Sequence, residues 1–276
     1  MEERQLEFVK NQFIKIGAKE AFTADLVEKL KAYEPLIKHE YIKAFPDGAA
    51  NAVFHVKRST TTENYFLTKM DMSTIIAGTN IKHGNTFYFN HRNYERGDQP
   101  DNTTFLQAYN FLQCRSVFFP NNKIWEQEVP SPSYKRGFFF EAFDQSYGYD
   151  LGKVLDQYSF FNPHDKLSIL ESLQAGNLEK QKFITRDGTQ RDYFITPAIT
   201  SGSLDLFDEN RKLVPIKEQI DQELISKKLG KKLERQEATN LKLNVVQSTD
   251  IGKGKSIKQT IIEKFAPIKK LLRKVR

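Results

Sequence analysis

Apolar residues in the middle of the chain recur at the spacing of a short helix. Leu151, Val154, Leu155 and Tyr158 fall on one helical face. The carboxylate of Asp150 can accept hydrogen bonds from the free N–H groups of the first turn. We therefore expect a helix that begins after Asp150.

A second helix is expected directly after the first. Asn162 can serve as its N-cap, and Pro163 stands at the first helical position, where its missing N–H costs nothing. Leucines at 167, 170 and 173 form its apolar stripe, and Gly176 can supply the left-handed residue that ends it.

The rest of the chain up to Pro215 shows alternating, β-branched and aromatic segments between further helical patterns. Phe87, Tyr88 and Phe89 are expected as a short strand inside a long connection, and Asp187-Gly188 indicates a hairpin. Further helices are expected over residues 3–16, over residues 23–33 and from Thr103 or Thr104 to Leu112. Further strands are expected near residues 37–45, 52–57, 64–69, 116–119, 123–128, 137–143, 182–185, 192–196 and 203–208.

This order predicts an α+β fold of small antiparallel sheets packed by helix pairs, in two or three modules. The expected modules are residues 1–100, residues 101–215 and a basic, helical or partly disordered extension over residues 216–276. Residues 23–56 and 164–196 share the order of helix followed by hairpin, which favours an internal duplication. The alternative is that any helix followed by a meander has this layout.

Composition indicates a folded protein with a real core, because 39% of its 276 residues are hydrophobic and 12% are aromatic. Cys114 is the single cysteine, which excludes an internal disulfide and favours a reducing compartment. Neither a membrane-spanning run nor a signal-peptide pattern is present, so we expect a cytoplasmic protein.

Charge is distributed unevenly along the chain. Residues 211–276 hold 18 Lys/Arg and 7 Asp/Glu, a net charge of +11, which leaves −4 for residues 1–210. Such a basic end favours contact with nucleic acid, an anionic membrane surface or an acidic partner. The alternative is a solvated tail that only aids solubility. The candidate phosphate-binding residues are Lys253, Lys255, Lys258, Lys264, Lys269, Lys270, Arg273, Lys274 and Arg276.

Several motifs between Leu6 and Leu213 keep a fixed order. They are AVFHVKRS, NYFLTKMD, LQAYNFLQCRSVF, IWEQ, SYGYDL, SLQAGN, DGTQRDYFI and LDLFDENRKL. In this order the chain resembles an uncharacterised family of Bacteroidetes conjugative and other mobile elements, whose modules are also appended to type IA topoisomerases. Cys114 stands where the family's helix-to-strand corner has glycine. The resemblance implies a mobile-element context and work around DNA, and it provides no catalytic residues.

Few residues suggest chemistry. His83 and His91 flank the aromatic strand but lack the close spacing of a metal site, so we interpret them as exposed loop residues and expect no cofactor. Cys114, at the end of an apolar helix, is expected to be a buried, inert thiol rather than a nucleophile. The PDG at Pro46 is interpreted as a turn, and the GKGK at Gly252 lacks the spacing of a phosphate loop.

Tyr147 and Tyr149 flank Gly148 just before the first central helix. They could act as stacking platforms for nucleic-acid bases. The preferred interpretation is that they pack the helix pair onto its sheet, with Gly148 allowing a tight bend.

Together these features predict a non-enzymatic accessory protein of a mobile element that binds nucleic acid, DNA in preference to RNA, through its basic tail. One alternative is a protein–protein adaptor that recognises an acidic or element-encoded partner. Another is an enzyme of nuclease or topoisomerase-associated type.

Overall fold

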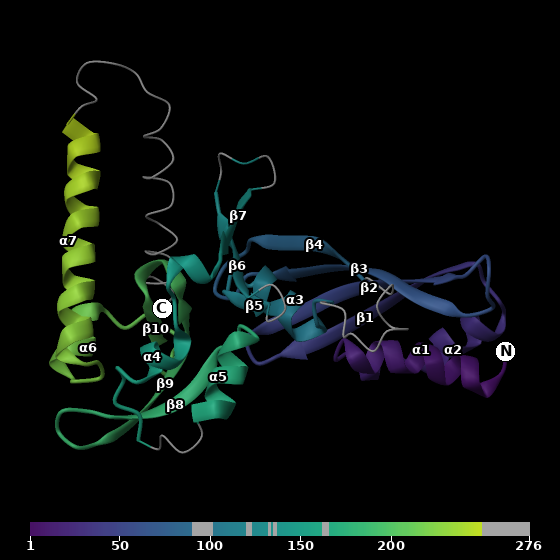
Figure 1. Ribbon diagram of the computed structural model, residues 1–276, viewed down its shortest axis with the longest axis horizontal. Coiled ribbons are helices and arrows are strands. Elements are labelled where there is room, and N and C mark those ends of the chain that lie inside the picture. Colours follow the sequence, from purple (N-terminus) through teal and green to yellow (C-terminus); the bar gives the residue numbers. More distant parts are fainter. Residues whose placement is uncertain (90–101, 120–122, 132–133, 135–136, 162–165, 250–276) are drawn as a thin grey trace. The chain divides into compact units, whose positions relative to one another are not determined.

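The chain has an α+β fold, as predicted (Figure 1). A computed structural model describes residues 1–89, 102–119, 123–131, 134, 137–161 and 166–249, with side chains as far as residue 239. They form three antiparallel sheets, of four, three and three strands, in two compact units, Met1–Cys114 and Arg115–Arg276. Within these described segments, no helix is both long and apolar enough to span a bilayer.

The first unit is built on a four-stranded meander. Each strand pairs with the next one along the chain. Phe54, Met70 and Met72 point into the core, whereas Lys38 and Glu40 lie on the other face, because successive side chains of a strand alternate in direction. The strands are β1 (Leu36–Phe45), β2 (Gly48–Arg58), β3 (Tyr65–Ile75) and β4 (Lys82–Tyr88).

Three helices cover the apolar face of this sheet. Phe105 and Tyr109 pack between Phe45 and Phe54, and the rings of Phe45 and Tyr109 stack with centroids 3.8 Å apart. Thr104 begins the last of these helices with a capping box. The helices are α1 (Glu3–Lys15), α2 (Ala24–Lys31) and α3 (Phe105–Leu112), and the short 3₁₀ turn η1 (Lys19–Ala21) joins the first two.

The second unit contains two three-stranded meanders. Its core includes Trp125, Leu173, Phe183 and Ile195. The Asp187-Gly188 hairpin forms as predicted, with Gly188 at φ +78°. One sheet consists of β5 (Val117–Phe119), β6 (Ile124–Pro130) and β7 (Phe138–Phe143), and the other of β8 (Glu179–Ile184), β9 (Gln190–Ala198) and β10 (Ser203–Phe207), in the order β10-β9-β8.

Among the described residues of the second unit, four helices and two 3₁₀ turns accompany these sheets. The predicted cap of the first helix is present, because the Asp150 carboxylate accepts from the Lys153 N–H at 3.1 Å. Asn162 and Pro163 lie outside the described residues. The elements are η3 (Gln145–Tyr147), α4 (Leu151–Leu155), α5 (Lys166–Gln174), η5 (Ile199–Ser201), α6 (Ile216–Asp221) and α7 (Lys227–Thr249).

Some predicted elements differ from the structure. β3 continues to Ile75, and β4 is a full strand where a short one was expected. The interpretation of His83 as an exposed loop residue is wrong, because His83 is a buried β4 residue whose Nδ1 lies 2.8 Å from the Leu112 carbonyl oxygen. His91 lies outside the described residues.

The division into units also differs from the expected modules. α3, which was placed in the module of residues 101–215, packs on β3 and β4 of the first unit. Part of the expected extension, residues 216–233, contributes to the core of the second unit through Leu224, Leu229 and Leu233. The internal duplication stays a prediction.

Candidate functional site

The first turns of α7 carry a group of exposed cations. The Ser226 hydroxyl caps the helix by accepting from the Leu229 N–H at 3.2 Å. Leu229 and Leu233 are buried in the core of the second unit and fix which side of the helix faces inward. We call the exposed set the α7 cationic face, and its members are Lys227, Lys228, Lys231, Lys232 and Arg235.

The five cations share one side of the helix. At about 100° per residue they span an arc of about 140°, next to the arc occupied by Leu229 and Leu233. In the part of the chain that the structure describes, none of the five forms a salt bridge with a carboxylate. Because like charges four residues apart destabilise a helix, an anion bound along this face would relieve the repulsion.

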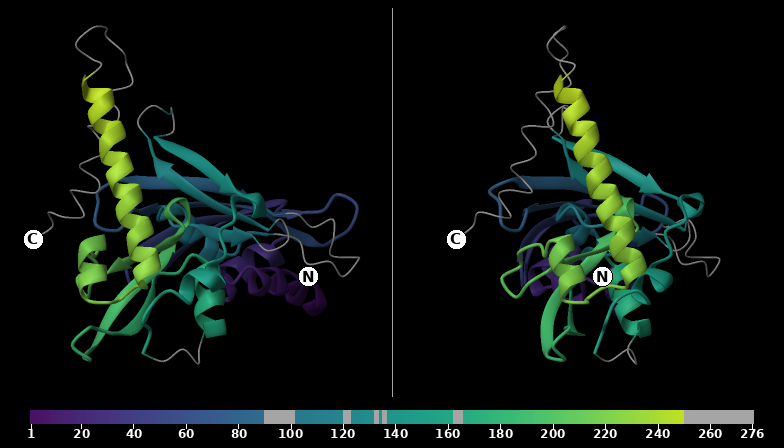
Figure 2. Two further views of the ribbon diagram at one scale, coloured as in Figure 1. Left: turned by 60° about the vertical axis from the view of Figure 1, so that its left-hand side comes forward. Right: turned by 90° about the vertical axis from the view of Figure 1, so that its left-hand side faces the viewer.

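Close packing between α6 and α7 orients the cationic face. A Cβ atom at Gly230 would lie 2.9 Å from Cγ1 of Ile220, so only glycine permits this approach. Figure 2 shows the first turns of α7 beside α6. The helix is therefore held by Ile220 on one side and by the core on another, and its cations remain in solvent.

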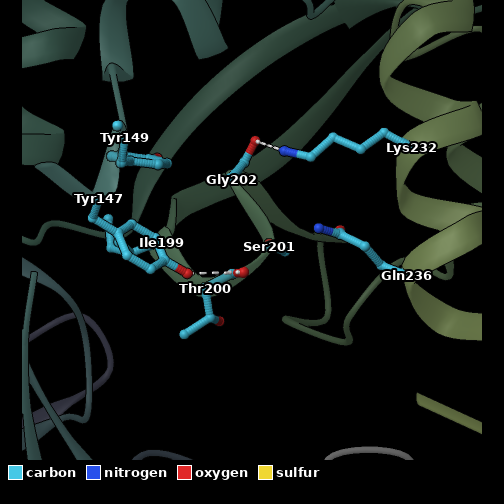
Figure 3. Close-up of a pocket in the computed structure, with 9 residues that line it drawn as sticks. Tyr147, Tyr149, Ile199, Thr200, Ser201, Gly202, Lys232 and Gln236 are labelled. Carbon is cyan, nitrogen blue, oxygen red and sulfur yellow. Dashed lines mark hydrogen bonds between the residues drawn. The ribbon is translucent and has the colours of Figure 1, made fainter. Parts of the chain in front are cut away.

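An open hollow of about 220 Å³ lies beside the cationic face, between α7 and the turns that follow β7 and β9 (Figure 3). Lys232 and Gln236, one helical turn apart on α7, form one wall. Tyr147, from η3, forms the opposite wall. The remaining lining residues are Gly148, Tyr149, Ile199, Thr200, Ser201 and Gly202.

Tyr147 presents an aromatic ring to solvent in a fixed orientation. The residue is 49% exposed. Its ring packs edge-on against Phe143 with centroids 4.8 Å apart, and its hydroxyl lies 3.3 Å from the Thr200 carbonyl oxygen, to which it donates. Gly148 follows at φ +78°, which ends the 3₁₀ turn. These contacts fix the ring at the rim of the pocket.

Lys232 reaches across the floor of the pocket to the turn before β10. Its Nζ lies 3.5 Å from the Gly202 carbonyl oxygen, a long contact for an ammonium group. Gly202 has φ +62°, and a Cβ atom there would lie 2.6 Å from Nζ. Glycine at this position therefore adopts the left-handed conformation that the turn requires, and it leaves room for the Lys232 ammonium group.

Tyr149 has a structural role, unlike Tyr147. Its hydroxyl donates to the Ser203 carbonyl oxygen at 3.1 Å, and its ring meets Trp125 edge-on. Burial, with the nearby Tyr158 and Asp205, raises the pKa of its phenol above the usual range. The predicted packing role is correct for Tyr149, whereas Tyr147 lies at the surface.

The other sequence-predicted site residues divide into two groups. The nine candidate phosphate-binding residues, Lys253, Lys255, Lys258, Lys264, Lys269, Lys270, Arg273, Lys274 and Arg276, lie outside the described residues, as does the GKGK segment. Cys114 is half-buried rather than buried, and its φ of +59° is left-handed. The Pro46 turn is confirmed, since Asp47 lies in the β1–β2 hairpin and accepts from the Tyr109 hydroxyl at 2.8 Å.

No metal-binding group is found among the described side chains of His, Cys, Asp and Glu. The buried histidines have other partners. His39 Nε2 lies 2.8 Å from the Ala21 carbonyl oxygen, and His55 Nε2 lies 2.6 Å from the Asp71 carboxylate. Both contacts hold elements of the first unit together.

Sequence reasoning identified Tyr147 but missed Gly202, Lys232 and Gln236, which the fold brings to the same pocket. The missed residues lie 55 to 89 positions further along the chain. The Lys232–Gln236 spacing of one helical turn was a usable signal, but nothing local indicated which elements α7 would face.

Comparisons of the chain with protein-family models, curated proteins and solved structures gave no match.

Proposed function

We propose that this protein is a non-enzymatic accessory factor that binds nucleic acid through the sugar–phosphate backbone. The α7 cationic face, together with the basic residues beyond residue 250, supplies the contacts. The observation that carries the proposal is the arc of five exposed cations without carboxylate partners among the described residues. Cations in this arrangement neutralise phosphates without reading sequence.

The resemblance to proteins of mobile elements supports DNA as the nucleic acid and an element-encoded setting. The charge division adds to this, because residues 211–276 carry +11 and the remainder carries −4. A mildly acidic body favours contact with a polyanion through the basic end only.

Salt titration of binding tests the proposal. The triple variant Lys228→Gln/Lys231→Gln/Arg235→Gln should weaken binding of a DNA duplex. It should also reduce the slope of log K against log [salt] by about 2.7, since each phosphate contact contributes about 0.9. Fluorescence anisotropy with a labelled duplex measures both quantities.

A matched control removes three exposed lysines of the first unit, as Lys19→Gln/Lys31→Gln/Lys57→Gln. Net charge falls equally in the two variants, so a contribution of total charge alone would affect both in the same way. Equal slopes for the two triple variants would contradict the proposal, as would tighter binding to polyglutamate than to DNA.

Truncation tests the tail separately. The chain should end after residue 249 and not after Pro215, because Leu224, Leu229 and Leu233 belong to the core of the second unit. We expect the shortened protein to fold and to bind duplex with a smaller salt slope. Unchanged affinity and slope would remove the tail from the interface.

A further inference from the structure

We propose that the pocket between Tyr147 and Lys232 binds one unpaired nucleotide, so that the protein prefers a single strand to a duplex. This inference rests on the proposed function, because the strand reaches the pocket along the α7 cationic face. Lys232 belongs to both the face and the pocket, which makes the two surfaces continuous.

The aromatic wall fits the flat face of a base. Tyr147 is 49% exposed, and its contacts with Phe143 and Thr200 hold the ring in place before any ligand arrives. A fixed ring loses little side-chain freedom on binding, so stacking on it is favoured. Every base has such a face, which makes this contact tolerant of sequence.

The opposite wall fits the polar groups of a nucleotide. The Lys232 ammonium has three N–H donors and a single long contact, to the Gly202 carbonyl oxygen, among the described residues. It can therefore donate to a phosphate oxygen. Gln236 lines the same wall, and its side-chain amide nitrogen points into the pocket (Figure 3). That nitrogen can donate to a carbonyl oxygen or a ring nitrogen of a base.

The size of the pocket limits the ligand to something small. A hollow of about 220 Å³ is below the roughly 300–1,000 Å³ of pockets that enclose drug-sized molecules. The hollow is open to solvent, which allows a chain to enter and leave. One nucleotide of a strand that continues along α7 meets both conditions.

Duplex geometry excludes this mode of binding. In a duplex the bases are paired and stacked on their neighbours, and a side chain at a protein surface cannot lie against the face of one. The phosphates of a duplex remain available to the α7 cationic face. The pocket therefore adds affinity for single strands only.

The test compares the full chain and four variants on a single strand and a duplex of equal length. Tyr147→Leu should weaken single-strand binding about tenfold, the effect expected for one lost stacking contact, and leave duplex binding unchanged. Tyr147→Phe keeps the ring and should retain most of the affinity. Tyr134→Leu is the matched control, because Tyr134 is also 49% exposed but lies outside the pocket. DNA and RNA single strands are tested in parallel.

The outcomes separate this inference from the proposed function. Equal affinity of Tyr147→Leu and the unaltered protein for single strands would overturn the pocket's role, and the proposed function would stand if the α7 triple variant still lost binding. Equal losses on single strand and duplex would also overturn it. Thermal melting of Tyr147→Leu shows whether the second unit remains folded. Lys232→Gln should weaken binding of both nucleic acids, and of the single strand more than the duplex, because Lys232 belongs to both the α7 cationic face and the pocket.

Discussion

His55 Nε2 lies 2.6 Å from the Asp71 carboxylate, across neighbouring strands β2 and β3. One residue of β3, Thr68, bulges out of the register beside this pair, and its hydroxyl donates to the His55 carbonyl oxygen at 2.9 Å. Thr86 on β4 donates to the same carboxylate at 2.6 Å, so Asp71 links three strands of the first unit.

Replacing Asp71 should lower the free energy of unfolding of the first unit near neutral pH but not in strong acid. Burial raises the pKa of Asp71, but hydrogen bonds from Thr86, His55 and Lys69 together outweigh burial and hold the pKa below its usual value of 3.8. The carboxylate therefore contributes fully above the unfolded pKa, and its contribution is lost as pH falls through the folded pKa. We expect Asp71→Asn to cost about 1 kcal/mol at pH 6, a modest amount because the side chain is partly exposed.

Urea unfolding of both proteins from pH 6 to pH 2 measures this difference. The free energies of unfolding of the two proteins should begin to approach each other as the pH falls below about 4. A gap that persists unchanged at pH 2 would show that the carboxylate charge is not responsible.

Gln12 should be hard to replace. From α1 its amide donates to the Tyr65 carbonyl oxygen and accepts from the Leu67 N–H, each at 2.9 Å, in the core of the first unit. Gln12→Met keeps the shape but leaves two buried backbone groups of β3 without these partners. We expect a loss of about 2–4 kcal/mol in the free energy of unfolding. Gln5→Met removes only an exposed hydrogen bond, the one from the Glu2 N–H at 3.0 Å in the α1 capping box, and should cost no more than about 1 kcal/mol.

Tyr158 should make a similar contribution in the second unit. Its buried hydroxyl accepts from the Leu204 N–H at 2.7 Å and donates to the Leu204 carbonyl oxygen at 3.3 Å. Tyr158→Phe removes both contacts without changing the shape of the ring, and we expect it to cost about 1–3 kcal/mol. Hydrogen exchange of the Leu204 amide should accelerate in this variant. Exchange at the unaltered rate would contradict the assignment.

Cys114→Gly should stabilise the first unit. Cys114 ends α3 with φ +59°, a conformation that costs most residues about 1–2 kcal/mol and glycine nothing. Glycine loses about 0.5–1 kcal/mol more in backbone entropy on folding, so the net gain is between about 0 and 1.5 kcal/mol. The melting temperature measures it, with Cys114→Ser as the control that keeps a side chain. Lower stability of the glycine variant would show that contacts of the thiol outweigh the backbone cost.

The local sequence pattern was sufficient to predict those elements whose residue types are typical of the structure that they form. The α3 helix follows from the Thr104 cap and its apolar face, and the β8–β9 hairpin follows from Asp187-Gly188. β4 was underestimated because His83, Gly84 and Asn85 have the composition of a loop. What makes them a strand is pairing with β3 and the contact of His83 with Leu112, and neither is visible in a local window.

The candidate site was predictable only in part for the same reason. The basic character of the end of the chain is a property of composition. Tyr147 was considered as a stacking residue, but packing onto the sheet was the preferred interpretation. The pocket needs Lys232 to reach Gly202, and that contact depends on how α7 packs on the second unit. Residues 216–276 were expected as an extension outside the modules, so the core positions of Leu229 and Leu233 in α7 were not predicted.

The position of α3 in the chain has a consequence for the order in which the protein folds during synthesis. The four strands of the first unit pair with their sequence neighbours and can form as each emerges from the ribosome. α1 and α2 precede the strands and can cover part of their apolar face, but the part that α3 covers stays exposed until Phe105 and Tyr109 have been synthesised. At roughly 5–20 residues per second this interval lasts a few seconds, during which that part of the face is open to a chaperone.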